Sequence, residues 1–176
     1  MIGLKKGIVE LVFHQEGWHW IAQNTISELK GMLGDMAIDV QHIGSTSIKG
    51  IHAKPIIDLQ IGLKNLDEII QPEPIEKLRL IGFEYKPESE PEFDWRRYFR
   101  KDSNGYRTHH LHAVIYQGKD WNRHNLFRDF LNSNPEWAKK YDELKFSLMR
   151  KFKHEREKYT EGKSELIFEI LKIASK

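Results

Sequence analysis

The chain has 176 residues, of which 39% are hydrophobic and 31% are charged, and its formal net charge is +2. This composition is too apolar for a disordered chain and fits one globular domain over residues 1–176, and the small net charge argues mildly against a nucleic-acid partner. Because cysteine is absent, disulfides and thiolate chemistry are excluded. No apolar run is long enough to span a membrane and the N-terminus lacks a secretory signal, so we expect a cytoplasmic protein without a membrane partner.

The first half of the chain begins with a helical pattern. Apolar residues at helical spacing predict a helix over Gly17–Leu33, and Gly34 is expected to end it. Alternating apolar and polar residues then predict two strands, at residues 37–43 and 55–63. These strands flank a polar connection that contains Gly44 and Ser45.

The next segment is punctuated by proline. Between residues 66 and 81 a helical pattern is interrupted by Pro72 and Pro74, so we expect a turn followed by a helix from about Pro74. Gly82 is expected to be the C-cap of that helix. Residues 87–94 are acidic and proline-punctuated, which predicts a loop within the domain.

The second half of the chain predicts a hairpin followed by helices. Residues 95–101 and 106–116 flank the polar turn Asp102-Ser-Asn-Gly, a pattern typical of two antiparallel strands. Further helices are expected over residues 121–132, from Pro135 onward, and over residues 160–174. Strands in the middle with helices at both ends indicate an α+β fold.

The connection between the first two strands carries the first candidate site residues. A small turn with free backbone N–H groups, such as Gly44-Ser45, can bind a phosphate. Asp58 follows fourteen residues after Gly44, on a strand where a carboxylate is costly to bury unless it is paired, hydrogen-bonded or metal-bound. Asp58 and Gln60 share one face of that strand. The alternative readings are a plain turn and an aspartate on the solvent face.

Two histidines on the hairpin form the second candidate set. His110 and His112 lie two residues apart, so both rings point to one face of the strand, and His109 points to the other. With Asp58 they would form a set of two imidazoles and one carboxylate, which prefers Mn²⁺, Fe²⁺ or Zn²⁺ over Mg²⁺. We therefore expect Asp58 and His112 to converge on one cleft. The alternative is a hydrogen-bonded pair of surface histidines.

Basic residues gather around the hairpin. Strand alternation puts Arg96, Tyr98 and Arg100 on one face, where they could line a polyphosphate groove or form a charged edge that discourages aggregation. Lys54 could neutralise phosphate charge or remain solvated. The neighbours Arg128-Asp129 on a predicted helix are expected to form a structural pair.

The sequence HIGSTSIKGIHAKPIIDLQIG at residues 42–62 resembles the signature of the GrpB family of small bacterial proteins. Later segments resemble later blocks of that family in the same order, namely RTHHLHAVIY, NLFRDFLNSNPEWAKKYDELK and YTEGKSELI. The resemblance extends from about Val9 to the C-terminus. It implies the fold of the polymerase-β-like nucleotidyltransferases, an α+β fold with a mixed β-sheet backed by helices and a C-terminal helical segment.

The resemblance also implies a function, metal-assisted transfer of a nucleotidyl group from a nucleoside triphosphate to an acceptor. The expected ligands are a nucleotide or another phosphate-bearing small molecule and a divalent metal, Mn²⁺, Zn²⁺ or Mg²⁺. The implied roles are catalysis by Asp58 and Ser45, phosphate binding by Gly44, Ser45, Lys54, Arg96 and Arg100, and metal binding by Asp58, His110 and His112.

One position departs from the wider superfamily, which usually has a second acid where this chain has Gln60. A neutral amide is a weaker ligand for a hard cation, so Gln60→Asp is expected to raise Mg²⁺ affinity. Two alternative functions remain open. One is a non-catalytic nucleotide- or phosphate-binding module with a degenerate transferase site, and the other is a metalloenzyme that uses Asp58 with the two histidines.

Overall fold

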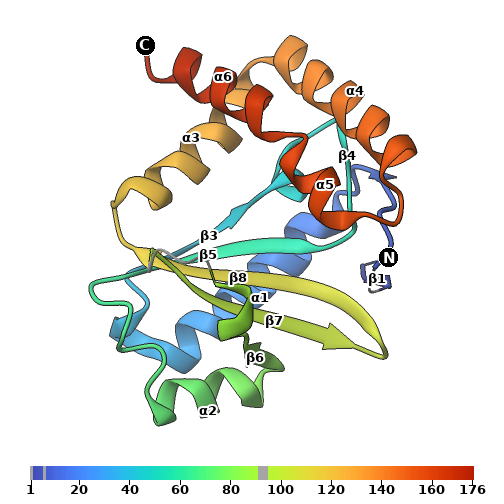
Figure 1. Cartoon of the computed structure of the whole chain (residues 1–176). Helices are drawn as coiled ribbons and strands as arrows, with labels where there is room; N and C mark the ends of the chain where they lie inside the picture. Colours follow the sequence, from blue (N-terminus) through green and yellow to red (C-terminus); the bar gives the residue numbers. More distant parts are fainter. Residues whose placement is uncertain (1, 6, 91–94) are drawn as a thin grey trace.

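The computed structural model describes residues 2–5, 7–90 and 95–176, and its centre is a six-stranded mixed sheet (Figure 1). One pair of central strands, over residues 57–63 and 106–115, is parallel, and the other neighbouring pairs of the sheet are antiparallel. The short strand β1 (Leu4–Lys5) pairs with residues 106–107 at the start of the second of these central strands. The strand order is β3 (Asp39–Ile43), β5 (Ile57–Leu63), β8 (Tyr106–Ile115), β7 (Arg97–Ser103) and β6 (Phe83–Tyr85). A separate two-stranded sheet joins β2 (Val12–Phe13) to β4 (His52–Ala53).

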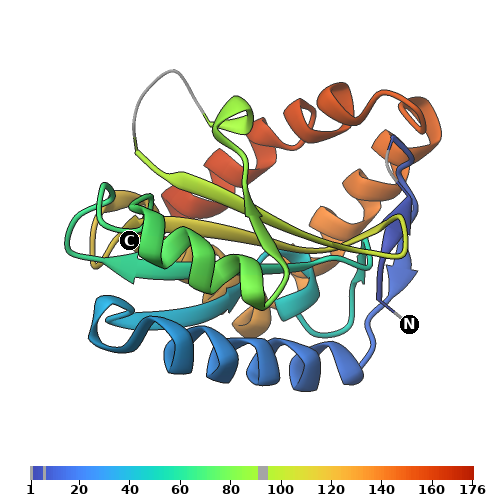
Figure 2. The ribbon, with the colours of Figure 1, turned by 90° about the horizontal axis from the view of Figure 1, so that it is seen from below.

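Helices lie on both faces of the large sheet. Helices α1 (Gly17–Leu33) and α2 (Pro72–Leu80) lie side by side across one face (Figure 2). Above the other face in Figure 1 lie α3 (Lys119–Ser133), α4 (Pro135–Lys151), α5 (Arg156–Glu161) and α6 (Ser164–Ala174). Single 3-10 turns occur at η1 (Gly34–Met36), η2 (Ser45–Ser47) and η3 (Pro87–Ser89).

The face under α1 and α2 holds the main core. Ile57, Leu59 and Ile61 of β5 are fully buried there with Leu111 of β8 and Phe99 of β7. Their positions follow the two-residue period that the sequence predicts, because alternate side chains of a strand point to opposite faces. The polar residues between them, including the candidate site residues of β5 and β8, must therefore face α3–α6.

The C-terminal helices are held by two smaller apolar clusters at the margin of the sheet. Ile48 and Ile51, in the connection after β3, pack against Tyr141 of α4 and Ile170 of α6. A second cluster joins the N-terminal segment to α4 and α5 through Val9, Leu148 and Tyr159. Because these contacts are made by the connection after β3 and by the N-terminal segment, the part of the polar face around Asp58 and His110 remains available to line a cavity.

The predicted α+β fold, with a mixed sheet and a C-terminal helical segment, is confirmed. Helix α2 begins at Pro72, earlier than predicted, and β6 lies where no strand was predicted. The segment predicted as one helix over residues 160–174 forms the end of α5 and the whole of α6. Gly162 lies between the two helices, where a Cβ would approach Leu148 Cδ1 to 3.1 Å, so this position is packed closely against α4. Residues 91–94 of the predicted loop lie outside the described residues. Within the described residues, no helix is long and apolar enough to cross a bilayer.

Candidate functional site

The strand register brings the candidate residues of three strands into two adjacent rows. Asp58 of β5 pairs with His110 of β8, which pairs with Arg100 of β7. In the next row of the same face, His112 pairs with Tyr98. The side chains of Asp58 and His112 line one cavity, as the sequence predicts.

Asp58 and His110 form the central pair of this site. The Nδ1 atom of His110 donates to Oδ1 of Asp58 at 2.7 Å, and the two side chains are 9% and 28% exposed, respectively. On the other side of the ring, Nη2 of Arg156 lies 3.4 Å from Nε2 of His110. A guanidinium can only donate, so Nε2 is the acceptor and the proton of the neutral ring is on Nδ1.

The charge state of the pair follows from its surroundings. Burial acts to raise the pKa of Asp58, but the hydrogen bond from His110 and the electrostatic effects of the His110 and His112 rings and of Lys54 hold it below its usual range. Burial lowers the pKa of His110, against the effect of the Asp58 carboxylate. The pair is therefore a carboxylate and a neutral imidazole at neutral pH.

The Gly44-Ser45 turn lies directly against Asp58. Gly44 has φ of 70° and ψ of −174°, and a Cβ there would lie 2.8 Å from Asp58 Cβ and 3.0 Å from its Cγ. Glycine is therefore required both for the backbone conformation and for the close approach. Ser45 donates its hydroxyl to Tyr141 Oη at 3.5 Å and lines the same cavity as Asp58.

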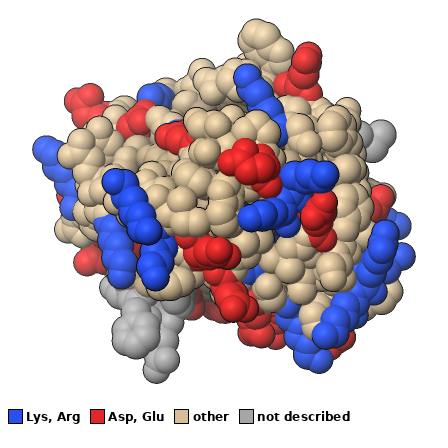
Figure 3. Space-filling model, turned by 90° about the horizontal axis from the view of Figure 1, so that it is seen from above, with Lys and Arg blue, Asp and Glu red and all other residues tan. Residues whose placement is uncertain are grey.

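A cavity of about 710 Å³ lies between the sheet and the C-terminal helices. Among the described residues, it is lined by seven Lys and Arg side chains against three acids. The outer surface over α4 and α6 shows no comparable excess of one charge, because positive and negative side chains are interspersed there (Figure 3). The excess of positive charge inside favours an anionic ligand. The cations are Lys54, Arg96, Arg100, Arg107, Arg123, Arg156 and Lys163, and the acids are Asp58, Glu157 and Glu161.

Four of these seven cations were not among the predicted site residues. Arg107 is turned toward the cavity by a register shift opposite Lys101 and Asp102, where β8 has one more residue than β7. Arg123, Arg156 and Lys163 come from the C-terminal helical segment. Lys163 belongs to the block YTEGKSELI, and Arg156 lies three residues before that block. The resemblance of this block to the family assigned no chemistry to either residue.

Arg96 lies in the cavity lining but is already engaged. Its Nη1 donates to Nδ1 of His112 at 2.9 Å and its Nη2 to the carbonyl of Ser89 at 3.0 Å. The guanidinium also stacks on the rings of Trp95 and Tyr98, at 4.9 and 5.1 Å. Burial, followed by the charge of Arg96, lowers the pKa of His112 well below its usual value. Arg96 therefore holds a neutral His112 in place.

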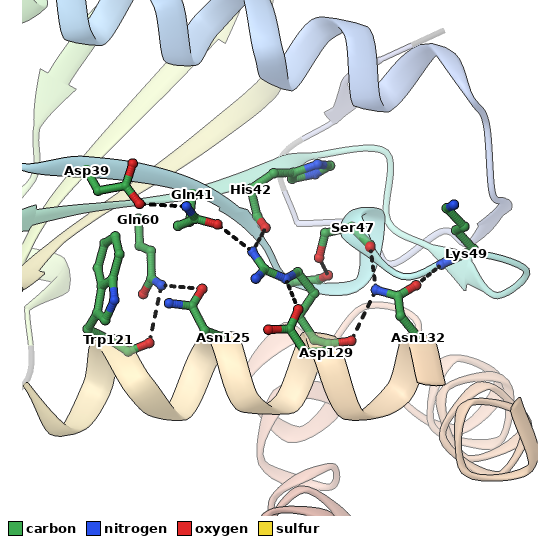
Figure 4. A network of polar contacts seen from close by, with 12 residues as sticks. Asp39, Gln41, His42, Ser47, Lys49, Gln60, Trp121, Asn125, Asp129 and Asn132 are labelled. Carbon is green, nitrogen blue, oxygen red and sulfur yellow. Dashed lines mark hydrogen bonds and ion pairs between the residues drawn. The ribbon is translucent and has the colours of Figure 1, made fainter. Parts of the chain in front are cut away.

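Gln60 points into the base of α3 and is fully buried (Figure 4). Its Nε2 donates to the Trp121 carbonyl at 3.3 Å and to Asn125 Oδ1 at 3.0 Å, and its Oε1 accepts from Nδ1 of His124 at 3.0 Å. Gln60 is not among the described residues that line the cavity. The residue in place of the second acid is therefore a structural link between β5 and α3.

Arg128 makes a second link from α3 to the sheet, and its predicted pairing with Asp129 is confirmed. Its Nε lies 2.7 Å from Asp129 Oδ1, and its Nη1 donates to Gln41 Oε1 at 2.9 Å and to the His42 carbonyl at 3.0 Å (Figure 4). The His42 ring bonds Thr46 Oγ1 at 2.9 Å and so braces the turn, and burial lowers its pKa to about 4.

These contacts predict unequal costs for two neighbouring substitutions. Arg128→Ala is expected to lower the free energy of unfolding by about 1.5–3 kcal/mol, because charge-assisted bonds to β3 are lost. Asp129→Ala is expected to cost less than about 1 kcal/mol, since its side chain is 62% exposed. Urea denaturation of both variants measures the difference, and equal costs would contradict this assignment.

The three predicted metal ligands already have polar partners in the protein. Within the described residues, no group of three or more His, Cys, Asp or Glu side chains is arranged to hold a metal ion. Asp58 and His110 bond each other, and Nδ1 of His112 accepts from the positive Arg96. As arranged, these side chains do not provide a coordination set, so metal binding by Asp58, His110 and His112 stays a prediction.

Comparison with known proteins places this architecture in a family. The family described as "GrpB protein" matches residues 8–173. This chain belongs to the GrpB family. The glutamate-rich protein GrpB of Alkalihalophilus pseudofirmus is 40% identical over 174 residues, which cover 97% of this chain and 98% of that protein. The YqkA protein of Bacillus subtilis is 36% identical over 90% of this chain, which spans 45% of YqkA.

A solved structure of the family has the same fold. The crystal structure of GrpB from Enterococcus faecalis matches with a TM-score of 0.83 and 31% identity, over 94% of this chain and 96% of that one. The Cid1 poly(U) polymerase matches 72% of this GrpB chain with a TM-score of 0.44 and 13% identity. This second likeness is too distant to bear on function.

Proposed function

We propose that this GrpB protein binds a nucleoside triphosphate in the cavity and transfers its nucleotidyl group to a small acceptor. The observation that carries the proposal is the Asp58–His110 pair, with its 2.7 Å hydrogen bond, in a cavity whose described lining has seven cations against three acids. Gly44 and Ser45 lie beside the Asp58 carboxylate, and Lys54 and Arg100 line the same cavity. Lys54 and Arg100 would neutralise the phosphates, and they would stabilise the charge that develops on a leaving pyrophosphate.

The pair suits acid–base chemistry in this transfer. An acceptor hydroxyl would attack the α-phosphorus while its proton moves to Nε2 of His110, and the bond from that phosphorus to pyrophosphate would break. Asp58 fixes the proton on Nδ1 and would stabilise the imidazolium that forms. In these steps His110 acts as a proton acceptor, in place of the metal-ligand role that the sequence analysis gave it.

Asp58→Asn tests the transfer. The amide keeps the size of the side chain but removes the charge that stabilises the imidazolium, so we expect transfer to fall by about 10²-fold or more. The assay follows label from an α-labelled nucleoside triphosphate into new products of a low-molecular-weight bacterial extract, with one pyrophosphate released per product. Unchanged transfer in Asp58→Asn would contradict the proposal.

The hydrogen bonds of Gln60 to α3 favour a second candidate, a non-catalytic nucleotide- or phosphate-binding module. Both polar atoms of its amide are hydrogen-bonded to α3, so the position of the second acid supplies no cation ligand. Thermal shifts with each nucleoside triphosphate and with Mg²⁺, Mn²⁺ and Zn²⁺ narrow the candidates, and the transfer assay above separates the module from the His110 route. Synergy between nucleotide and metal supports metal-assisted transfer, a shift with nucleotide alone supports the module or the His110 route, and a shift with metal alone supports the metalloenzyme.

A further inference from the structure

We infer that the side of the cavity formed by α5, the start of α6 and the β4–β5 connection is a polyphosphate site, built by Lys54, Arg156 and Lys163. The inference rests on the proposed function and names the part of the ligand that this side receives. Its ligand is a chain of two or three phosphates, as in a nucleoside di- or triphosphate, because the three cations offer more positive charge than the about −1.5 to −2 that a single phosphate group carries at pH 7.

Two of the three cations lie over one buried ring, and the third comes from the same helix as that ring. Nζ of Lys54 lies 5.4 Å from the centroid of Tyr159, and Nζ of Lys163 lies 4.8 Å from the same centroid. Tyr159 is 1% exposed and belongs to α5, one turn after Arg156. Lys54 comes from the sheet side of the cavity and Lys163 from the helix side, so an anion between them would be held from both walls.

The positive charge of this group is not compensated within the described part of the chain. No acid there forms an ion pair with Lys54, Arg156 or Lys163, although Glu157 and Glu161 also line the cavity. By contrast, Lys145 pairs with Asp142 at 3.2 Å. Cations that face one cavity without counter-ions repel one another, so a bound anion stabilises them.

The state of Lys54 supports the same site. Burial, followed by the charges of Lys163 and Arg156, lowers the pKa of Lys54 to about 7, against the opposite effect of Asp58. An anion bound beside the ammonium would raise this pKa again. The groups that face Lys54 are Asp58 from β5, Arg107 from β8, Arg156 and Tyr159 from α5, and Lys163.

Arg156 also connects this site to the reacting pair. In the described structure its Nη2 donates to Nε2 of His110 at 3.4 Å. A phosphate chain would compete for that guanidinium, because a charge-assisted bond to phosphate is stronger than one to a neutral imidazole. Binding of the polyphosphate would therefore free the lone pair that the acceptor proton needs.

Calorimetric titration of the full chain with inorganic tripolyphosphate tests the site. We expect Arg156→Ala and Lys163→Ala each to weaken binding about tenfold or more, because each removes charge-assisted hydrogen bonds. Arg123→Ala removes the same charge from α3 in the same cavity and is the matched control, with an expected change of less than about threefold. We expect tripolyphosphate to bind at least about tenfold more tightly than orthophosphate.

Proton uptake gives an independent readout. At about pH 8, titrations in buffers of different ionisation enthalpy should show protons taken up on tripolyphosphate binding, and Lys54→Met should remove this uptake.

Absence of tripolyphosphate binding, an equal loss in Arg123→Ala, or equal affinity for orthophosphate would overturn the inference. Tripolyphosphate binding at this site without nucleotidyl transfer would overturn the proposed function alone, and transfer that survives Arg156→Ala and Lys163→Ala would overturn this inference alone.

Discussion

Gly44→Ala is expected to lower the free energy of unfolding by about 2–4 kcal/mol and to abolish ligand binding. Gly44 has φ of 70° and ψ of −174°, a backbone conformation that side-chain-bearing residues rarely adopt. The added Cβ would also lie 2.8 Å from Asp58 Cβ, closer than carbon atoms pack. The methyl group must therefore displace the Asp58 side chain and with it the hydrogen bond to His110.

Gly50→Ala is the matched control for this effect. Gly50 lies in the same connection, has φ of 74°, and would place its Cβ in open space. We expect it to cost only about 1–2 kcal/mol of backbone strain and to leave tripolyphosphate binding unchanged. Urea denaturation and calorimetry on both variants give the comparison, and equal losses of binding would show that the contact with Asp58 is unimportant.

Strand periodicity allowed the polar face of the sheet to be predicted from sequence. Asp58, His110 and His112 alternate with apolar residues, so their common direction follows from the pleat alone. Their approach to one another depends on the parallel pairing of β5 with β8. The family resemblance, and not the periodicity, predicted that these two strands are neighbours. Arg96 was correctly placed on this face, but its engagement by His112 was not expected.

Contacts that join distant segments could not be predicted in the same way. Arg156 lies on α5 and Lys163 directly precedes α6, and the apolar pattern of these helices gives no direction relative to the sheet. Arg107 reaches the cavity because of a β-bulge, which changes the face of a residue without any sequence mark. Periodicity put Gln60 on the same face as Asp58, yet α3 covers this residue and leaves Asp58 accessible.

Gln60→Glu is therefore expected to destabilise the protein by about 2–4 kcal/mol at neutral pH. The change keeps the length of the side chain and replaces a buried donor by a charged acceptor. The Asn125 amide can turn to donate to the new oxygen, but the Trp121 carbonyl cannot, and Gln60 is 0% exposed. A buried negative charge would then face a carbonyl oxygen without solvent to screen it.

The cost should depend on pH in one direction. Burial would raise the pKa of the new carboxyl group in the folded state above its unfolded value of about 4.3. Below that value both states are protonated and the penalty is small. It grows as the pH rises from the unfolded-state pKa to the folded-state pKa, and it is constant at higher pH. Urea denaturation at about pH 4 and about pH 8 measures this, with Gln60→Met as the control, since loss of an uncharged amide should cost the same at both.

The same geometry reverses the expectation that an acid at this position would bind Mg²⁺. A carboxylate introduced by Gln60→Asp or Gln60→Glu would point toward Trp121 and Asn125 of α3, as the amide does, and away from the cavity that Asp58 lines. We therefore expect neither variant to gain Mg²⁺ affinity over the unsubstituted protein in calorimetric titration. A clear gain in either variant, with stability retained at neutral pH, would mean that α3 moves aside to open a second ligand position beside Asp58.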